Sequence, residues 1–400
     1  MEIMFKESET LYSEEFLLRS IPASKRLVIG IPKENQSIET RLALTPEGVE
    51  ILTEVGHEVL LQSGAGQAIG YSDLSYAEAG AIIVNDAASA FAADIVLKIA
   101  PPTPQEISLM NDRAALFSLL QLSLLSRESV RLMMQKKINA VAYELIKDKQ
   151  RKFPVLNSLS EIEGIAAVSI ASQYMSSDNG GKGLLLGGIA GVSATEVIIL
   201  GAGIAGISAA RTAMALGAQV KIFDHDINKL RKLQQLLGQH VFTSVIHPKV
   251  LFKALLSADA VIGMLKYING SERFMIAEDL VRTMKKGAVI VDLSVDQHGC
   301  FETSECRPLS NPAFEKHGVI HYCVPNLSSR VGRTASMALS NIFTPLMLKI
   351  AATGSVKKAA HNDFGIRNGL YIYNGILVNP LIGKHLNIPA NDIGLFMAGF

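Results

Sequence analysis

Cysteine is scarce in this chain of 400 residues. The three cysteines, Cys300, Cys306 and Cys323, are too few and too clustered to build a disulfide framework. No CxxC pair and no paired histidine pattern accompanies them, so the sequence offers no zinc site. We therefore expect reduced thiols that act as small core residues, a cytoplasmic location and no bound metal.

An excess of charge of either sign is also missing. The 38 basic and 37 acidic residues leave a formal net charge of +1. A protein that binds nucleic acid or anionic lipid neutralises many phosphates with a strongly basic face. We therefore expect neither a nucleic acid nor a membrane among the partners.

Apolar runs long enough to cross a bilayer are not found either. The most apolar runs fall short of the roughly 18 residues that a spanning helix needs; they are Ala114–Ser126, Gly183–Thr195, Val197–Ala210 and Thr334–Leu348. Residues Met1–Arg26 alternate acidic and apolar side chains without the continuous apolar segment of a signal peptide. We expect a soluble protein in which residues 1–26 form an appended arm or helix.

From Arg26 onward, short apolar segments alternate with amphipathic ones, a pattern typical of an α/β protein with parallel sheets. Helices are expected to begin at Thr45-Pro46, with Thr45 as N-cap, and at the capping-box pattern Ser160-Glu161-Ile162-Glu163. A third helix is expected over Thr334–Ala351. The expected strands are Leu27–Ile31, His57–Gln62, Asp94–Lys98, Ala114–Leu120, Asn139–Glu144, Val197–Leu200, Gln219–Phe223, Ala258–Gly263, Ala288–Leu293 and Gly318–Val324.

The length predicts more than one domain, because 400 residues exceed what a single hydrophobic core usually organises. We predict two Rossmann-like, doubly wound domains. Residues 155–332 would form a dinucleotide-binding domain. That domain would be inserted into a discontinuous substrate domain made of residues 1–154 and 333–400.

A glycine-rich segment supplies the most specific motif. The buried-strand pattern Val197-Ile198-Ile199-Leu200 runs directly into Gly201-Ala202-Gly203-Ile204-Ala205-Gly206, and a helix of small residues follows. In such a loop Gly201 allows the tight turn, Gly203 lets backbone N–H groups approach a pyrophosphate, and Gly206 permits close helix–strand packing. The strand, the loop, the helix and the next strand together predict a dinucleotide site.

Asp224 indicates which dinucleotide is bound. It ends the strand after the glycine loop, where a carboxylate accepts hydrogen bonds from the ribose hydroxyls of adenosine. The same carboxylate would repel the 2′-phosphate of NADP, so we predict NAD. Lys229 either covers a ribose or lies on the helix surface.

Polar residues near the carboxyl ends of the expected strands are candidates for a substrate site, because ligands collect at that edge of a doubly wound sheet. Arg41 and Lys98 could hold a small carboxylate, whereas Asp296 and Asn326 offer groups for hydrogen bonding or proton transfer. Gln121 follows another of these strands. Taken one at a time, each is more commonly a solvated charge or a loop cap.

At these residues the chain resembles the alanine dehydrogenase family, which shares its fold with the NAD-binding subunit of proton-translocating transhydrogenase. The resemblance runs from about Leu27 to the C-terminal tail and rests on many motifs in the same order. They are Ile31-Pro32-Lys33-Glu34, Arg41-Leu42-Ala43-Leu44-Thr45-Pro46, Gly64-Ala65-Gly66, Leu97-Lys98, Ala142-Tyr143-Glu144, Leu159-Ser160-Glu161, Gly187-Gly188, the glycine loop, Val291-Asp292-Leu293-Ser294-Val295-Asp296-Gln297 and Tyr322-Cys323-Val324-Pro325-Asn326.

The resemblance implies an activity and roles for single residues. The reaction would convert L-alanine and NAD to pyruvate, ammonia and NADH in a homohexamer whose nucleotide domain closes over the substrate. Arg41 and Lys98 would bind the carboxylate and carbonyl of the 2-oxo acid. Asp296 would lie beside the nicotinamide ribose and the substrate, and Ser160 and Asn326 would line the cofactor.

Gln121 departs from the family pattern, because dehydrogenases of the family carry a histidine there that is thought to be the general acid/base. An amide binds substrate but takes up no proton near neutral pH. Lys98 or Asp296 would then carry the proton, the substrate would differ, or activity would be lost. Two alternatives to an alanine dehydrogenase therefore stay open: a transhydrogenase-like subunit that binds NAD(H), and an NAD-binding protein with altered catalysis.

Overall fold

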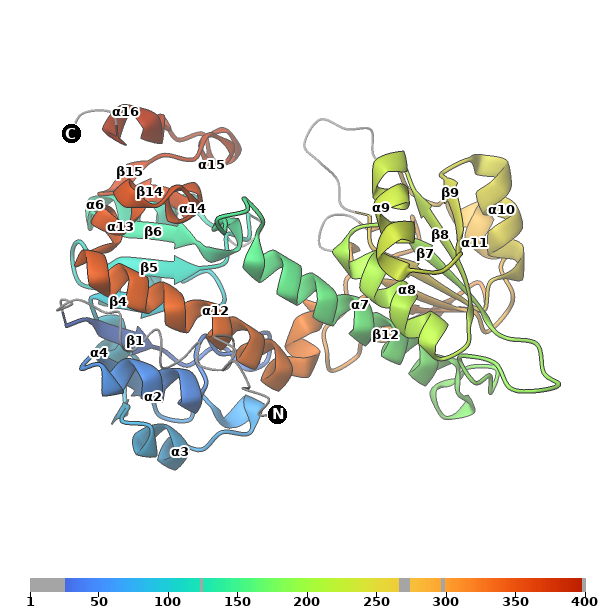
Figure 1. Ribbon diagram of the computed structural model, residues 1–400, viewed down its shortest axis with the longest axis horizontal. Coiled ribbons are helices and arrows are strands. Elements are labelled where there is room, and N and C mark those ends of the chain that lie inside the picture. The colour runs from blue at the N-terminus through green and yellow to red at the C-terminus, as the bar shows by residue number, and fades with distance from the viewer. Residues whose placement is uncertain (1–25, 123–124, 266–273, 296–298, 398–400) are drawn as a thin grey trace, which may run out of the picture. The chain divides into compact units, whose positions relative to one another are not determined.

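The computed structural model describes residues 26–122, 125–265, 274–295 and 299–397, and the chain divides into two compact units. The first unit comprises Met1–Leu156 and Gly332–Phe400, and the second comprises Asn157–Val331. Each unit contains one twisted sheet with helices around it (Figure 1). The arm expected over residues 1–26 lies, except for Arg26, outside the described residues, and so does Asp296.

The sheet of the first unit has the strand order β15-β14-β6-β5-β4-β1-β2-β3. The strands from β1 to β6 are parallel to their neighbours, whereas β14 and β15 are antiparallel additions beside β6. The parallel strands therefore lie in the doubly wound order 3-2-1-4-5-6. The strands are β1 (Val28–Ile31), β2 (Glu58–Gln62), β3 (Ile82–Val84), β4 (Ile95–Leu97), β5 (Ala115–Ser118), β6 (Asn139–Ala142), β14 (Leu370–Tyr373) and β15 (Ile376–Leu377).

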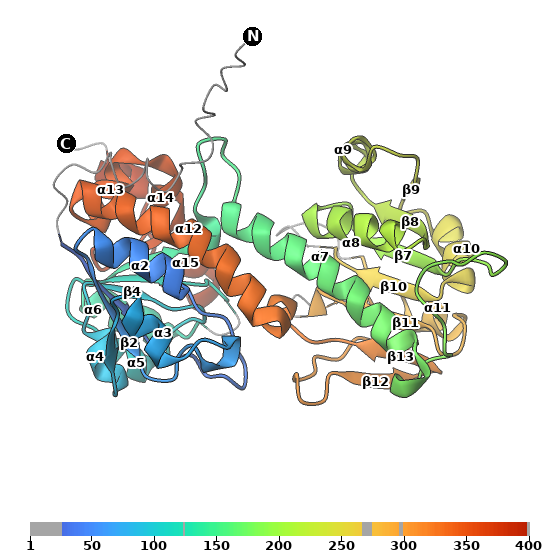
Figure 2. The same cartoon turned by 60° about the horizontal axis from the view of Figure 1, so that its bottom comes forward.

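Helices cover both faces of this sheet (Figure 2). On one face α4, α5 and α6 contribute Phe91, Ile107 and Met133 to the core, and α2 packs against α12. Thr45 is the N-cap of α2, as predicted, but its hydroxyl donates to Ser340 of α12 at 3.3 Å and bonds no N–H of its own helix. The helices are α2 (Pro46–Glu54), α3 (Asp73–Glu78), α4 (Ala87–Phe91), α5 (Pro104–Leu109), α6 (Arg127–Gln135), α12 (Gly332–Thr353), α13 (Val356–Asn362), α14 (Phe364–Gly369), α15 (Pro380–Leu386) and α16 (Ile393–Met397).

The sheet of the second unit has the order β12-β13-β11-β10-β7-β8-β9, in which β12 alone is antiparallel to its neighbour. The other six strands again follow the order 3-2-1-4-5-6, so the predicted fold class is confirmed for both units. The strands are β7 (Glu196–Leu200), β8 (Gln219–Asp224), β9 (Phe242–Val245), β10 (Ala260–Gly263), β11 (Val289–Asp292), β12 (Ala313–Lys316) and β13 (Val319–Tyr322).

Alternation along β7 builds two cores in this unit, because successive side chains of a strand point to opposite faces. Val197 and Ile199 pack with α7 (Pro154–Met175), α8 (Ile204–Ala215) and α9 (Ile227–Leu237). Ile198 and Leu200 pack with α10 (Pro248–Ser257) and α11 (Glu278–Arg282) on the opposite face. Burial on both faces explains why β7 is apolar throughout.

Two local predictions are wrong. Helix α7 begins at Pro154, so the pattern from Ser160 to Glu163 is not a helix start. Proline suits the first turn of a helix, where the N–H that it lacks would have no helical acceptor. Of the thiols, Cys300 and Cys323 are buried as expected, but Cys306 is exposed.

One helical stretch among the described residues, Leu327–Thr353, is long and apolar enough to pass a test for membrane spans, with a mean hydropathy of 1.3. It is longer than the helix predicted over Thr334–Ala351. Within its most apolar window, 61% is buried inside the structure. Such burial is typical of a core helix, so the stretch is weak evidence for a membrane segment.

Candidate active site

The carboxyl ends of β1 and β4 meet where the strand order of the first sheet reverses, and Glu34 and Lys98 follow these two strands. Nζ of Lys98 donates to Oε2 of Glu34 at 2.6 Å and lies 3.5 Å from Oε1 of Glu106. The backbone N–H of Ile99 donates to the second oxygen of Glu34 at 2.5 Å. Because Lys98 and Glu34 are both buried, this ion pair forms away from water.

Lys98 stays protonated in these surroundings. Burial lowers the pKa of its ammonium group, but the carboxylates of Glu34 and Glu106 outweigh burial, and the pKa lies above its ordinary value. At neutral pH Lys98 is therefore a fixed positive charge and hydrogen-bond donor. This state argues against Lys98 as the base that takes up a proton.

Arg41, in the loop between β1 and α2, forms a second buried ion pair. Its Nε and Nη2 groups donate to the two carboxylate oxygens of Glu39 at 2.8 and 2.6 Å, which is bidentate geometry. The next backbone N–H, that of Leu42, donates to the Ser336 hydroxyl of α12 at 2.8 Å. The loop therefore fixes the guanidinium through both its side chain and its backbone.

The phenol of Tyr143 lies among these charges. It is fully buried after β6 and donates to the carbonyl of Ile99 at 3.1 Å. Burial raises the pKa of Tyr143 well above its ordinary value, Arg41 lowers it, and three surrounding glutamates raise it. One of these glutamates is the partner of Arg41 and another is the partner of Lys98. The structure thus links to one phenol the two cations that the sequence suggested for one ligand, Arg41 directly and Lys98 through Glu34.

Gln121 follows β5 and is partly exposed. The backbone N–H just before it, that of Leu120, donates to Oε1 of Glu144 at 2.7 Å. This bond ties the segment that carries Gln121 to the end of β6. Within the described residues, no hydrogen bond joins the Gln121 amide to Arg41 or Lys98.

Asp296 has no described position, but the segments on either side of it meet at Asp292, the last residue of β11. The carboxylate of Asp292 accepts the N–H groups of Ser294 and Cys300 at 2.9 and 2.7 Å. It also accepts the Ser304 hydroxyl at 2.6 Å. A single buried carboxylate therefore holds residues before and after Asp296.

The glycine loop has the geometry that a pyrophosphate site requires. Gly201 adopts a φ of +117°, which L side chains rarely adopt. A Cβ on Gly206 would lie 1.9 Å from the carbonyl oxygen of Gly201, so helix and strand pack too closely for any side chain. A Cβ on Gly203, the N-cap of α8, would meet nothing within 4 Å. The free space at Gly203 lies at the N-terminus of a helix, where an anion is favoured.

Asp224 ends β8 and is buried beside this loop. One carboxylate oxygen accepts the N–H of Ala202 at 2.7 Å, and the other accepts the N–H of Asp226 at 2.9 Å. Each carboxylate oxygen can accept more than one hydrogen bond, so these contacts are compatible with a ribose hydroxyl. Lys229 is exposed on α9, which favours the surface interpretation of this residue.

Ser160 lies in α7, and the structure gives this helix a close contact with the loop region. A Cβ on Gly164, one turn after Ser160, would lie 2.2 Å from the carbonyl of Ala205. Asn326, just after β13, has a φ of +58°. The Ser328 hydroxyl donates to its side-chain oxygen at 3.4 Å. Both residues lie in the second unit, which also contains the glycine loop.

Two family models match almost the whole chain. They describe the alanine dehydrogenase/PNT N-terminal domain, matched by residues 30–163, and the alanine dehydrogenase/PNT C-terminal domain, matched by residues 167–380. The chain belongs to the alanine dehydrogenase/PNT family.

Relatives in the family are similar over nearly their full length. The alanine dehydrogenase of Bacillus subtilis is 37% identical over 361 residues, which are 90% of this chain and 95% of the relative. That of Staphylococcus saprophyticus is 36% identical over 368 residues, 92% of this chain and 99% of the relative. Among solved structures, an L-alanine dehydrogenase matches with a TM-score of 0.83 at 36% identity, covering 90% of this chain and 99% of that one. A transhydrogenase from Sinorhizobium meliloti matches with a TM-score of 0.74 at 25% identity, covering 88% and 99%.

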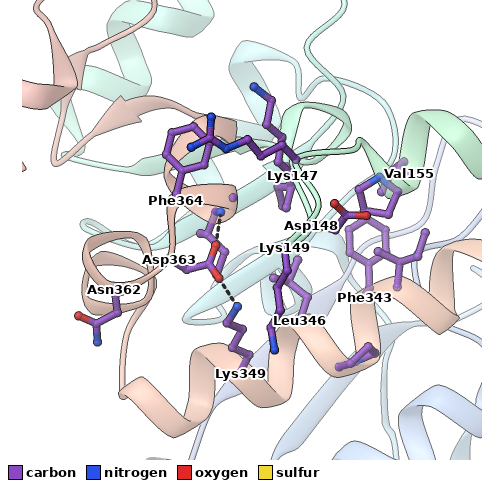
Figure 3. A pocket seen from close by; sticks show the side chains of 17 residues that line it. Lys147, Asp148, Lys149, Val155, Phe343, Leu346, Lys349, Asn362, Asp363 and Phe364 are labelled. Atoms are coloured by element: carbon purple, nitrogen blue, oxygen red, sulfur yellow. Dashed lines mark hydrogen bonds and ion pairs between the residues drawn. The ribbon is translucent and has the colours of Figure 1, made fainter.

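The first unit contains a cavity of about 560 Å³, and Figure 3 shows the side chains that line it. Its walls come from residues 146–155, α12 and α14, and include Lys147, Phe343 and Phe364. Lys349 and Asp363 form an ion pair at its edge. None of the candidate site residues lines it, so this cavity does not locate the family's site.

Sequence reasoning missed the acidic partners of the cationic residues. Glu34 and Glu144 lie within the family motifs, which assign them no role, and Glu39 and Glu106 lie outside these motifs. Glu34 lies 64 residues from Lys98, and no periodicity connects positions so far apart. The available signal was the topology, since β1 and β4 are neighbours in any 3-2-1-4-5-6 sheet.

Proposed function

We propose that the protein catalyses the reversible, NAD-dependent oxidative deamination of L-alanine to pyruvate and ammonia. The observation that carries the proposal is the buried cluster of Arg41, Lys98 and Tyr143 in a chain that is 35–37% identical to alanine dehydrogenases over most of its length. In this proposal the first unit is the substrate domain and the second is the NAD-binding domain.

Arg41 and Lys98 hold the substrate. A guanidinium recognises a carboxylate by paired N–H donors, and Glu39 fixes the plane of the Arg41 group before substrate arrives. Lys98 carries a permanent positive charge and donates to the carbonyl oxygen of pyruvate, which stabilises negative charge as that oxygen gains it. Gln121 donates or accepts a hydrogen bond but moves no proton.

A nicotinamide cofactor fits the second unit, and we propose that it is NAD. When bound, it accepts the hydride from the α-carbon of alanine or returns it to the imine of pyruvate. The residues that hold it are Ser160, Gly201, Ala202, Gly203, Ile204, Ala205, Gly206, Asp224 and Asn326, with Asp296 at the nicotinamide ribose. Asp224 selects NAD, because no second charge offsets its carboxylate among its contacts in the described residues.

Asp296 is the proposed proton carrier, since Lys98 stays protonated and Gln121 does not titrate. It would take the proton of the water that adds to the imine and return one to the departing amine. The proposal extends to a cytoplasmic homohexamer, as the family resemblance implies.

The first test is NADH oxidation with pyruvate and ammonium, compared with NADPH. We expect turnover with NADH and loss of kcat/KM on the order of 100-fold in Arg41→Ala and Lys98→Ala, while both variants still bind NADH. Lys149→Ala, an exposed cation of the same unit, is the matched control. Full activity in both site variants would reject the assignment of Arg41 and Lys98 to substrate binding.

One observation favours a second function, an NAD(H)-binding protein without turnover: the amide of Gln121 where the family carries a histidine. In that case the wild type binds NADH but is silent with pyruvate and ammonium, and Gln121→His restores activity. A transhydrogenase-like subunit would be silent in both forms and would pass hydride to a second nucleotide.

A further inference from the structure

Glu144 has a buried carboxylate oxygen with no partner among the described residues. The residue is 8% exposed; Oε1 accepts the N–H of Leu120 at 2.7 Å, whereas Oε2 has no hydrogen-bond partner. A buried polar atom without a partner costs free energy, so its presence calls for an explanation. The proposed mechanism makes no use of this group.

The sheet register places Glu144 next to the segment of Gln121. β5 and β6 are parallel, and Ser118 pairs with Ala142 at their carboxyl ends. Leu120 and Glu144 each lie two residues beyond these ends, so their hydrogen bond extends the contact between the two strands. Gln121 is the next residue. Glu144 therefore fixes the backbone of Leu120, the residue directly before Gln121.

Among the described residues, no positive charge pairs with the Glu144 carboxylate. Tyr143 precedes it, and the phenol of Tyr371 in β14 interacts with it, beside the Ser118 hydroxyl of β5. In α14, which packs against residues 143–145, the guanidinium of Arg367 is directed to two backbone carbonyls of its own region. No ion pair joins Glu144 to a basic residue in the described part of the chain. Burial therefore raises the pKa of Glu144 to about 7, although the Leu120 N–H lowers it in part.

We propose that Glu144 is a positioning residue of the substrate site, and that its protonation state controls the segment that carries Gln121. In the ionised form the carboxylate accepts the Leu120 N–H in a charge-assisted hydrogen bond and fixes that segment. In the protonated form this hydrogen bond weakens, because the carboxylic acid carries no negative charge. The inference rests on the proposed function, in which Gln121 contacts the substrate.

The expected pH dependence of kcat/KM follows from the ionised and protonated forms of Glu144. Ionised Glu144 is the competent form, so kcat/KM for pyruvate rises with pH through about 7. Glu144→Gln keeps the size of the side chain and the acceptor for Leu120 but stays neutral. We expect this variant to lose the inflection and to remain on the order of 10-fold below wild type at alkaline pH, as for a charged hydrogen bond replaced by a neutral one.

The experiment measures kcat/KM for pyruvate against pH in wild type, Glu144→Gln and Glu128→Gln. Glu128 is exposed on α6 of the same unit, so its variant should keep the wild-type profile. The ionisation of ammonium affects all three proteins equally and cancels in the ratios. An inflection that persists unchanged in Glu144→Gln overturns the proposal. A wild type that is silent at every pH instead rejects the proposed function.

A second measurement decides the inference without activity. The side-chain amide of Gln121, assigned in ¹⁵N-labelled protein through the Gln121→Glu variant, is followed by NMR across pH. We expect its signals to shift with a midpoint near 7 in wild type and to stay constant in Glu144→Gln. Signals of Gln121 that do not change with pH in the wild type would overturn the proposal, even where the variant fails to fold.

Discussion

Lys98 shows how neighbouring charges determine the protonation state of a buried side chain. Burial by itself would favour the neutral amine, and the two carboxylates beside it reverse that preference. Glu34 is the closer of the two, at 2.6 Å, and also accepts the N–H of Ile99. The charge that we assign to substrate binding is therefore maintained by a residue that does not itself contact the substrate in the proposal.

Glu34→Gln tests this dependence. The amide keeps an acceptor for the Ile99 N–H but removes the charge, so the pKa of Lys98 should fall. We expect KM for pyruvate to begin rising at a lower pH than in wild type, because Lys98 loses its proton earlier. The measurement is KM against pH on the alkaline side. A profile that coincides with the wild type would show that Glu106 is sufficient to keep Lys98 charged.

At Asp224, one substitution can remove the negative charge and keep a hydrogen-bond acceptor. Asp224→Asn retains an acceptor for the Ala202 N–H and removes the negative charge. We expect the ratio of kcat/KM for NAD to that for NADP to fall on the order of 10-fold, because repulsion of the 2′-phosphate disappears. Steady-state kinetics with both cofactors measure the ratio. An unchanged ratio would mean that the shape of the site, rather than Asp224, selects the cofactor.

At the scale of elements, two glycines of the glycine loop serve different purposes: Gly206 allows the helix to pack on the strand, and Gly203 leaves space for a ligand. A Cβ at position 206 would lie 1.9 Å from a backbone oxygen, whereas one at position 203 would meet no atom within 4 Å. Gly206→Ala should therefore lower Tm, because α8 must move away from β7. Gly203→Ala should leave Tm nearly unchanged and weaken NADH binding, because the methyl group occupies the space of the pyrophosphate. Thermal unfolding and NADH titration distinguish the two, and equal effects of both variants on Tm would contradict this account.

The elements themselves divide into those that the sequence could predict and those that it could not. The strands at the centre of both sheets were predicted because burial on both faces requires continuous apolar runs such as Val197–Leu200. Among the missed strands, β9 and β12 are short edge strands with polar residues, Phe242–Val245 and Ala313–Lys316. Their pairing depends on a neighbouring strand rather than on their own pattern.

The candidate site also contains residues that the sequence could predict and residues that it could not. Cations and glycines were predicted from local motifs and from their place at strand ends. The partners of the cations were not, because the contacts of Lys98 with Glu34 and of Leu120 with Glu144 join segments that are distant in sequence. The Oε2 atom of Glu144 has no hydrogen-bond partner among the described residues, and only the packed structure can reveal this. The prediction for Asp296 stays a prediction, since it lies outside the described residues.

At the scale of the whole molecule, two buried histidines make stability depend on pH. His57 is 5% exposed, and neither ring nitrogen has a hydrogen-bond partner among the described residues, so burial lowers its pKa. Burial also lowers the pKa of His321 to about 4, although the carbonyl of Val319 opposes the shift. In the unfolded chain both would titrate near pH 6.5. The unfolded state therefore binds more protons below that pH.

The sign of the effect follows from linkage. The contribution of these histidines to folding is complete above about pH 6.5 and is lost as the pH falls. For His321 the loss amounts to about 3 kcal/mol at pH 4, since one unit of pKa corresponds to about 1.4 kcal/mol. Acid should thus unfold the protein even where no carboxylate pair is broken.

His57→Leu tests the contribution of His57 to this pH dependence, because leucine fills an apolar site and takes up no proton. The free energy of unfolding, measured by urea at fixed protein concentration, should fall less steeply between neutral and mildly acidic pH in the variant than in wild type. His240→Leu is the control, since His240 is exposed. Parallel pH profiles for His57→Leu and wild type would show that this buried imidazole keeps its neutral form in the unfolded chain too, or finds a partner on protonation. A shallower profile confined to His57→Leu would assign part of the acid sensitivity of the whole molecule to one buried side chain, the residue just before β2.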